Sequence, residues 1–235
     1  MAMVRRIGIF GGSFDPVHSG HVGLARRAIE EFHLDQLIVI PAAVSPFKVD
    51  AHATDPKVPR YDRLMLVRAA FNGMAKVVVD DRELRRGGVS YAIDTVREIA
   101  AENPGAEIIF LIGGDSVAGL PRWKDYDELQ KLCTFKALPR TRESSTEVRR
   151  RLAAGEPIDD LVPEAVALFI RYGVTENEDR KIVAVIRTGL ARKEGYCPCR
   201  LPKLPEFFCP CAEFRGQLAD SNYHGLCHCR LYRKP

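Results

Sequence analysis

The stretch Val4–His21, VRRIGIFGGSFDPVHSGH, decides the fold. A short apolar run ends in two glycines, and a helical pattern begins near Ser19 or Gly20. Glycine permits a tight turn and close approach of a ligand, and the free N–H groups at a helix start form an anion site. His18 and His21 then lie at or inside the first helical turn. This stretch therefore predicts a strand, a phosphate-binding turn and a helix.

After this stretch, apolar runs alternate with amphipathic segments as far as residue 173. The alternation predicts an α/β fold with a doubly wound parallel sheet, and such sheets bind ligands beyond the carboxyl ends of their strands. Strands are expected at residues 4–10, 36–42, 76–80, 106–114 and, weakly, 134–138. Helices are expected at residues 20–32, 60–71, 90–102, 126–132, 145–155, 163–173 and 179–195, the last after a polar linker.

Composition divides the chain near residue 175. Residues 1–175 hold 24 Lys/Arg and 24 Asp/Glu, whereas residues 176–235 hold 11 and 7 and so carry the whole net charge of +4. Six of the seven cysteines lie between Cys197 and Cys229. We expect two domains, 1–175 and 176–235, the second with too little periodicity to form its own apolar core. The absence of a signal-peptide pattern and of long apolar runs predicts a cytoplasmic protein with no membrane partner.

Four motifs, in the right order, resemble one enzyme family. GGSFDPVHSGH is similar to the HxGH signature of the nucleotidylyltransferase superfamily. The segments DDRELRRGGVSYAIDTV, FLIGGDSVAGLPRWKDYDEL and ESSTEVRRRLAAGEPIDDLVPEAV resemble nicotinate mononucleotide adenylyltransferases. The resemblance covers roughly residues 4–173. It implies transfer of an adenylyl group from ATP, with Mg²⁺, to nicotinate mononucleotide in NAD synthesis.

The resemblance also implies roles for individual residues. His18 and His21 would contact the ATP phosphates, with His21 at the reacting α-phosphate and Lys48 as a mobile cation. Trp123 stands in a Gly/Pro-rich loop and would stack on the pyridine ring, while Asp115 would hydrogen-bond a ribose. The remaining expected ligand contacts are Gly11, Gly12, Ser13 and Phe14 for ATP, and Tyr91 and Thr95 for the mononucleotide, with Thr95 near its carboxylate.

The segment SSTEVR has two interpretations. Ser144 with Glu147 three residues later is a capping box, so the hydroxyls could simply start a helix. A capped helix start with Ser145, Thr146 and Arg149 also suits a triphosphate, and the resemblance favours this role. Both interpretations can hold at once.

One segment departs from the family pattern. Only five residues, 139–143, separate the strand TFKAL from Ser144, where the family has a longer stretch with another strand. Such a loss is expected to weaken adenine binding or the sheet edge. Two rival hypotheses therefore stay open: a redox or binding protein with an inactive transferase domain, and a related nucleotidylyltransferase with another acceptor.

The cysteines form three Cys-x-Cys pairs, in CPCRLPKLPEFFCPC and CHC. Zinc usually takes four thiolates from Cys-x-x-Cys pairs, and disulfides are typical of secreted proteins. A four-thiolate iron–sulfur cluster plus one redox-active pair uses all six cysteines. Residue chemistry alone leaves the three alternatives open.

The pattern CPC…CPC…CHC resembles the catalytic chain of ferredoxin:thioredoxin reductase over about residues 178–233, with different gap lengths of nine and fifteen residues. The resemblance implies a [4Fe–4S] cluster, a redox disulfide beside it, and ferredoxin and thioredoxin-like partners. By motif order, Cys197, Cys209, Cys211 and Cys227 would hold the cluster, Cys199 and Cys229 would form the disulfide, and His228 would serve proton transfer. The basic tail suits an acidic donor. A nucleic-acid partner is not expected, because no basic helix face carries interleaved aromatics.

Overall fold

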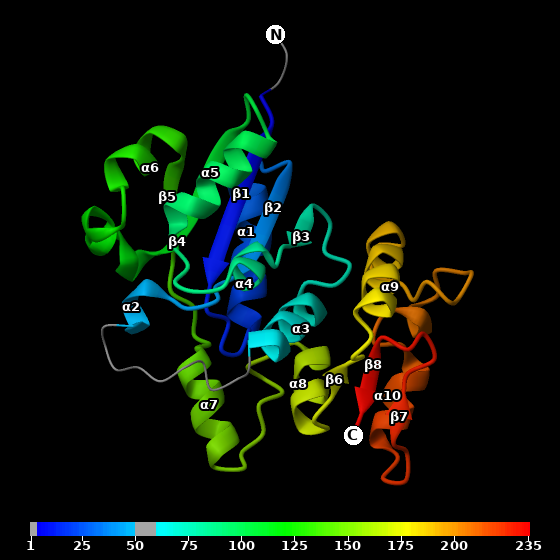
Figure 1. The fold of residues 1–235 in the computed structure, drawn as a ribbon. Helices are drawn as coiled ribbons and strands as arrows, with labels where there is room; N and C mark the ends of the chain where they lie inside the picture. Colours follow the sequence, from blue (N-terminus) through cyan, green and yellow to red (C-terminus); the bar gives the residue numbers. More distant parts are fainter. Residues whose placement is uncertain (1–3, 50–59) are drawn as a thin grey trace.

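A computed structural model describes residues 4–49 and 60–235 of the chain (Figure 1). Its centre is a five-stranded sheet in the order β3-β2-β1-β4-β5, with every neighbouring pair parallel. The strands are β1 (Arg6–Gly12), β2 (Gln36–Pro41), β3 (Val77–Val79), β4 (Glu107–Gly113) and β5 (Thr134–Leu138). The expected parallel sheet is confirmed, and each expected strand is present.

Strand β1 is central because both of its edges and both of its faces are covered. Gly8 pairs with Leu37 of β2 on one side and with Ile109 of β4 on the other. Ile7 and Ile9 are fully buried. Strands buried on both faces are continuous apolar runs rather than alternating ones, as the sequence of this sheet indicates.

Helices cover both faces of the sheet (Figure 1). One apolar cluster joins the sheet to α1 (Ser19–Glu31), α3 (Arg60–Ala70) and α8 (Glu164–Arg171). Another joins the opposite face to α5 (Ala92–Glu102) and α6 (Tyr126–Leu132). Further helices at the strand ends are α2 (Pro46–Val49), α4 (Arg82–Arg86), the 3₁₀ helix η1 (Gly114–Arg122) and α7 (Ser145–Ala153).

The C-terminal part has more regular structure than its sequence predicts. A small antiparallel sheet has the order β6-β8-β7. Its first strand, β6, lies in the segment that the sequence predicts as a polar linker. Its strands span only two or three residues, too few to show a period, and the eight-residue α10 buries only Phe214 and Leu218. The elements are β6 (Thr175–Glu176), α9 (Arg180–Arg192), the 3₁₀ helix η2 (Pro205–Phe207), α10 (Ala212–Ala219), β7 (Gly225–Leu226) and β8 (Tyr232–Lys234).

The apolar cluster beneath α3 and α8 continues into the cysteine-bearing segment. The rings of Phe169 and Tyr232 lie 4.6 Å apart, and Arg187 forms an ion pair with Glu176 at 2.6 Å. Just beyond α3, the Asn72 side-chain amide donates to the carbonyls of Gly195, at 3.0 Å, and Cys209, at 2.8 Å. The C-terminal segment therefore shares a core with the sheet domain. Within the described residues, no helix combines the length and apolarity needed to cross a membrane.

Gly73 allows the cysteine segment to approach α3 closely. Its φ is +70°, and a Cβ there would lie 2.6 Å from the Phe208 ring and 2.7 Å from the Glu194 carbonyl oxygen. Gly155 has a similar φ of +69°, but a Cβ there would meet open space. A side chain at either glycine would be strained by the positive φ. Only at Gly73 would its Cβ also overlap neighbouring atoms.

We therefore expect Gly73→Ala to lower the free energy of unfolding by about 3 kcal/mol or more, because backbone strain and overlap add. Gly155→Ala should cost only about 1 kcal/mol, the strain alone. Urea unfolding followed by circular dichroism measures both. Equal losses for the two variants would contradict the close approach at Gly73.

Candidate active site

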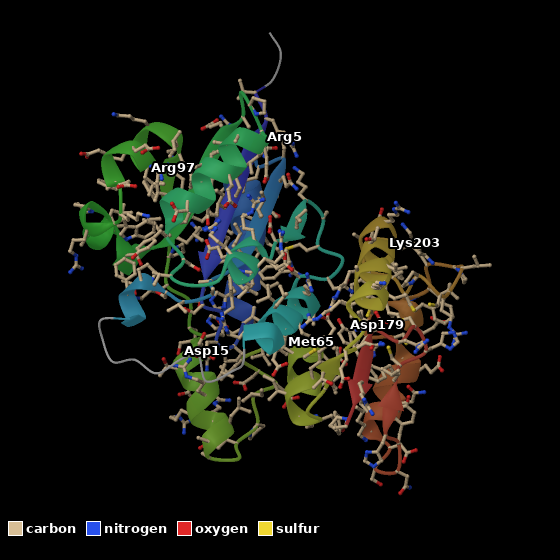
Figure 2. All side chains as sticks on the ribbon, in the orientation of Figure 1. Arg5, Asp15, Met65, Arg97, Asp179 and Lys203 are labelled. Atoms are coloured by element: carbon tan, nitrogen blue, oxygen red, sulfur yellow. The ribbon has the colours of Figure 1, made fainter. Side chains whose placement is uncertain are left out.

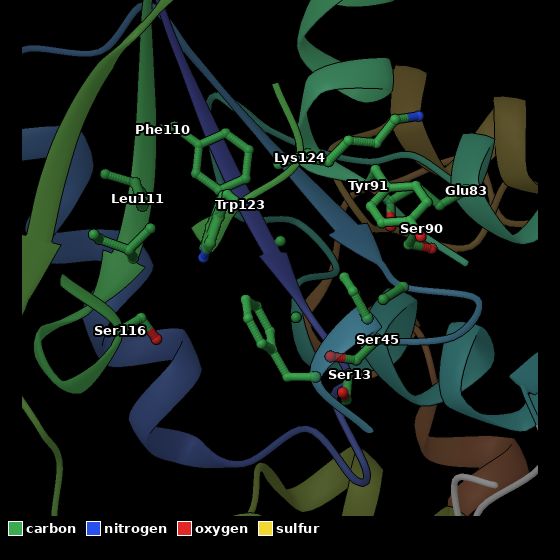
Figure 3. A pocket seen from close by; sticks show the side chains of 18 of the residues that line it. Ser13, Ser45, Glu83, Ser90, Tyr91, Phe110, Leu111, Ser116, Trp123 and Lys124 are labelled. Atoms are coloured by element: carbon green, nitrogen blue, oxygen red, sulfur yellow. The ribbon is translucent and has the colours of Figure 1, made fainter. Parts of the chain in front are cut away.

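A cleft of about 250 Å³ opens where β1, β2 and β4 end (Figure 3). Gly11 and Gly12 close β1, Ser45 follows β2, and Gly113 closes β4. Because the strands are parallel and in register, their carboxyl ends meet at one edge. The glycine turn expected to bind phosphate therefore lies in the wall of the cleft.

An aromatic wall faces the glycine turn. Trp123 is half-buried and packs edge-on against Phe110, with ring centroids 5.7 Å apart, while Phe47 lies 6.1 Å away. Figure 3 shows Trp123 and Phe110 beside one another above the turn. The Trp123 indole nitrogen is buried without a hydrogen-bond partner among the described residues. Trp123 thus belongs both to the core and to the cleft.

Tyr91 and Thr95 start α5, but only Tyr91 lines the cleft. Thr95 is 1% exposed, and its hydroxyl donates to Glu83 at 2.6 Å. Burial raises the pKa of Glu83, while its hydrogen bonds from Thr95 and Ser90 oppose that shift. Thr95 is therefore placed behind the cleft, where it holds Glu83 rather than facing a ligand.

Several residues of the cleft wall were not expected from the sequence. Glu83 and Ser90 lie within the motif DDRELRRGGVSYAIDTV, and Lys124 follows Trp123. The Lys124 ammonium lies 4.6 Å from the centroid of the Tyr91 ring. The position of Glu83 just after a short strand was the available signal, because strand ends carry ligand groups in this fold.

His18 and His21 lie together at the start of α1. Their rings are 3.7 Å apart, and the His18 backbone N–H donates to Nδ1 of His21 at 3.2 Å. Because this nitrogen accepts, the neutral His21 ring carries its proton on Nε2, which can donate to a ligand. Nδ1 of His18 is buried with no partner among the described residues. Both rings lie at the start of α1, beyond the glycine turn, and neither is among the residues that line the cleft.

Both imidazoles are neutral at physiological pH. Burial lowers the pKa of His18 to about 4, with Glu143 opposing the shift. Burial and the neighbouring His18 lower the pKa of His21 to about 3. The pair therefore offers hydrogen bonds to phosphate without adding charge.

Helix α7 brings the SSTEVR motif to the same loop. The Ser145 hydroxyl donates to the carbonyl of Pro16 at 2.9 Å. The Arg149 guanidinium donates to the carbonyl of Asp15 and lies 3.6 Å from its carboxylate. Figure 2 shows Asp15 beside the upper end of α7. The short connection 139–143 therefore still delivers α7 to the histidine loop.

Ser144 caps α7, as the sequence predicts. Its hydroxyl accepts the N–H of Glu147 at 3.1 Å, while the Glu147 carboxylate pairs with Arg150 and Arg151 instead of closing the capping box. Thr146 is exposed and accepts a hydrogen bond from Arg149 at 3.3 Å. The helix start is thus capped and open to solvent at the same time.

Two other expected contacts, Phe14 and Asp115, are not among the residues that line the cleft. Phe14 is buried, and its ring meets the His21 ring edge-on at 4.9 Å. Asp115 does not line the cleft but pairs with Arg140 at 2.9 Å, and it does not cap η1. Lys48 lies in α2, and its side chain is outside the described part of the structure.

Comparison with known proteins identifies the family. The sequence profile described as cytidylyltransferase-like matches residues 9–177, which include the glycine turn, both histidines and SSTEVR. The chain belongs to this family.

Two similar bacterial proteins carry the same name. A protein of Gemmatimonas aurantiaca, named "Probable nicotinate-nucleotide adenylyltransferase", is 39% identical in an alignment of 193 positions that covers 70% of this chain and 89% of that protein. A protein of Shouchella clausii with the same name is 40% identical in an alignment of 185 positions that covers 71% of this chain and 94% of that protein. The solved structure of the Plasmodium falciparum nicotinic acid mononucleotide adenylyltransferase shares the fold, with a TM-score of 0.54 and 16% identity over 72% of this chain and 96% of that chain.

The family match ends before the cysteines, which gather at a second place. Five of them are buried around one small cavity, together with the exposed His228. The Sγ atoms of Cys227 and Cys229 lie 3.6 Å apart. Cys199 alone is exposed. The five cysteines that line the cavity are Cys197, Cys209, Cys211, Cys227 and Cys229.

All six thiols are free, and their acidities differ. A hydrogen bond from the Cys229 thiol lowers the pKa of Cys197 to about 6 and that of Cys227 to about 7. Burial raises the pKa of Cys209 and Cys211. In the described part of the chain, no three His, Cys, Asp or Glu side chains have the spacing of a metal site. The six cysteines therefore offer the sulfur donors of a metal centre, but in this structure they are arranged as free thiols.

The neutral histidine pair predicts a pH dependence of stability. The pKa values of His18 and His21 are about 4 and 3 in the fold, below the ordinary value of 6.5. Between pH 6.5 and these values the unfolded chain binds protons that the folded chain does not. The free energy of unfolding should therefore fall as the pH falls from 6.5 toward 3.

A double variant, His18→Asn with His21→Asn, tests this dependence. Its free energy of unfolding, measured with urea at each pH, should fall less steeply than that of the wild type between pH 6.5 and 4. Above pH 7.5 the two curves should run parallel. Equal slopes below pH 6.5 would show that the two imidazoles are not held neutral.

Proposed function

We propose that the chain transfers the adenylyl group of ATP to nicotinate mononucleotide, releasing pyrophosphate and forming deamido-NAD. One observation carries this proposal: an aromatic cleft ending on Trp123 opens directly onto the glycine turn that leads to His18 and His21. The cleft suits a flat ring, and the turn and helix start suit phosphate. The names of the relatives support the same reaction.

The chain acts by positioning the reactants and stabilising charge. The acceptor phosphate oxygen attacks the α-phosphorus of ATP, and pyrophosphate leaves with the bonding electron pair. Backbone N–H groups of the glycine turn and the Nε2–H of His21 donate to the α-phosphate as charge builds on its oxygens. Ser145, Thr146 and Arg149 face the remaining phosphates at the start of α7. Mg²⁺, bound with ATP, screens the phosphate charge.

The acceptor is held at the opposite end of the cleft. Trp123 stacks on the pyridine ring. Arg122 and Lys124 flank Trp123 in the cleft wall, where they attract the carboxylate. Thr95 contributes indirectly, by holding Glu83. Asp115 reaches a ribose once Arg140 releases it, and Lys48 serves as a mobile phosphate ligand.

Transfer is tested with the full chain, ATP, Mg²⁺ and nicotinate mononucleotide, by following pyrophosphate and deamido-NAD together. We expect His21→Ala to lower kcat by about 10²-fold or more, because a donor to the developing charge is lost. Cys133→Ser serves as the control. Cys133 is buried beside β5 and does not line the cleft, so this variant should keep kcat near that of the wild type. Pyrophosphate release with a cytidylyl or phosphopantetheine acceptor, and none with nicotinate mononucleotide, would contradict the proposal.

We further propose that the cysteines hold an iron–sulfur cluster. The convergence of five buried cysteines on one cavity favours it. Cys197, Cys209, Cys211 and Cys227 would bind a [4Fe–4S] cluster, which supplies single-electron transfer when bound. Cys199 and Cys229 would be the dithiol/disulfide pair, one exposed and one buried, with the exposed His228 as proton carrier. Ferredoxin and thioredoxin-like proteins are the partners that this chemistry implies.

Anaerobic purification of the full chain tests the cluster. We expect a brown protein with about four irons and four sulfides per chain. Cys209→Ser should lose most of the iron, while Cys133→Ser, at the cysteine outside the cluster, should keep it. Stoichiometric zinc without sulfide would refute the iron–sulfur assignment, and three disulfides with no metal would refute it equally.

A further inference from the structure

Arg63 is the largest fully buried side chain of the described residues, with 0% exposure. It lies on α3, in the segment that packs beneath the ends of β1 and β2. Burying a guanidinium is costly unless its N–H groups are hydrogen-bonded, so its partners reveal why it is there.

Among the partners of Arg63 are backbone carbonyls of two loops. Nη1 donates to the carbonyl of Ser13 at 2.5 Å. Nη2 donates to the carbonyl of Ala42 at 2.9 Å and lies 3.4 Å from that of Ala43. Ser13 follows the glycine turn of β1, and Ala42 follows β2, so one guanidinium joins two strand ends.

These loops need such a link because the ladder stops there. The pairing of β1 with β2 ends at Gly12 and Pro41, and the Ala42 N–H then donates to the Gly12 carbonyl at 2.9 Å. Ser13 and Ala42 both line the cleft, whereas Arg63 does not. The carbonyls that Arg63 holds are therefore turned away from the cleft.

We propose that Arg63 is a positioning residue for adenylyl transfer, an inference that rests on the function proposed above. By binding the Ser13 and Ala42 carbonyls from behind, it keeps partial negative charge away from the phosphates. It also fixes the spacing between the two phosphate-facing loops and places a positive charge behind them. Only a planar fork reaches two loops at once, so lysine replaces the charge but not the geometry.

The test compares Arg63→Lys and Arg63→Met with a matched change on the same helix. Arg68 lies five residues further along α3, is also mostly buried, and pairs with Asp81 and Glu176 instead of the cleft loops. All variants are first checked by circular dichroism and unfolding midpoint, so that kinetics are measured on folded protein. Arg68→Met should lose stability and keep kcat.

We expect kcat/KM for ATP to fall about 100-fold in Arg63→Met and about 10-fold in Arg63→Lys, as loop misplacement predicts. The KM for nicotinate mononucleotide should stay within about threefold, because the pyridine end is held by Trp123. Added guanidinium ion should restore part of the activity of Arg63→Met but not that of Arg68→Met. A purely structural role would not lower kcat/KM for ATP while sparing the KM for nicotinate mononucleotide, and guanidinium ion would not restore activity.

Several outcomes overturn the proposal. Folded Arg63→Lys with the wild-type kcat/KM for ATP would do so, as would equal kinetic losses in Arg63→Met and Arg68→Met. If Arg63→Met does not fold, Arg63→Lys decides alone. A wild-type chain that forms no dinucleotide would instead refute the proposed function. In that case the affinity for ATP, measured by calorimetry, tests the role of Arg63. An ATP affinity that is unchanged in Arg63→Lys would reject that role.

Discussion

The burial of β1 is the constraint on which the rest of the structure depends. This strand is hydrogen-bonded to β2 and β4 on its two edges and is covered by helices on its two faces. Its chain can leave the sheet only along the strand axis, through Gly11 and Gly12. The glycine turn, the histidine pair and the start of α1 follow within ten residues. The position of the phosphate site is thus a consequence of packing the central strand.

Contacts distant in sequence complete the site around this turn. Ser145 and Arg149 approach Pro16 and Asp15 across some 130 residues of chain. The connection before α7 packs so tightly on α1 that a Cβ at Gly20 would lie 2.2 Å from the Thr141 hydroxyl. A short connection therefore suffices here, because it runs directly over the start of α1 instead of adding another strand.

Helix α3 lies between the two unusual parts of the molecule. Arg63, near its start, holds the loops of the cleft, and Asn72, just beyond its end, holds the carbonyls of Gly195 and Cys209. Met65, labelled on α3 in Figure 2, belongs to the apolar core that the two parts share. The cysteine segment is therefore packed on the same helix that supports the candidate active site.

The sequence was sufficient to predict the parallel sheet, because buried parallel strands are continuous apolar runs. It also placed His18, His21 and Trp123 correctly at strand and helix ends. It missed Glu83, whose hydrogen bond to Thr95 depends on how α4 and α5 pack, and it put Thr95 at the ligand. It found no structure in α10 or β7, since such short elements carry no period. The convergence of the cysteines on one cavity required the fold, because pair spacing alone does not fix which sulfurs meet.

The position of bound deamido-NAD in a crystal structure of the full chain tests the central claim most directly. The account predicts the pyridine ring against Trp123 and the phosphates between the Gly11–Gly12 turn and His21, with the Arg63 bonds intact. A dinucleotide bound elsewhere, or one whose phosphates do not contact the turn and His21, would contradict it.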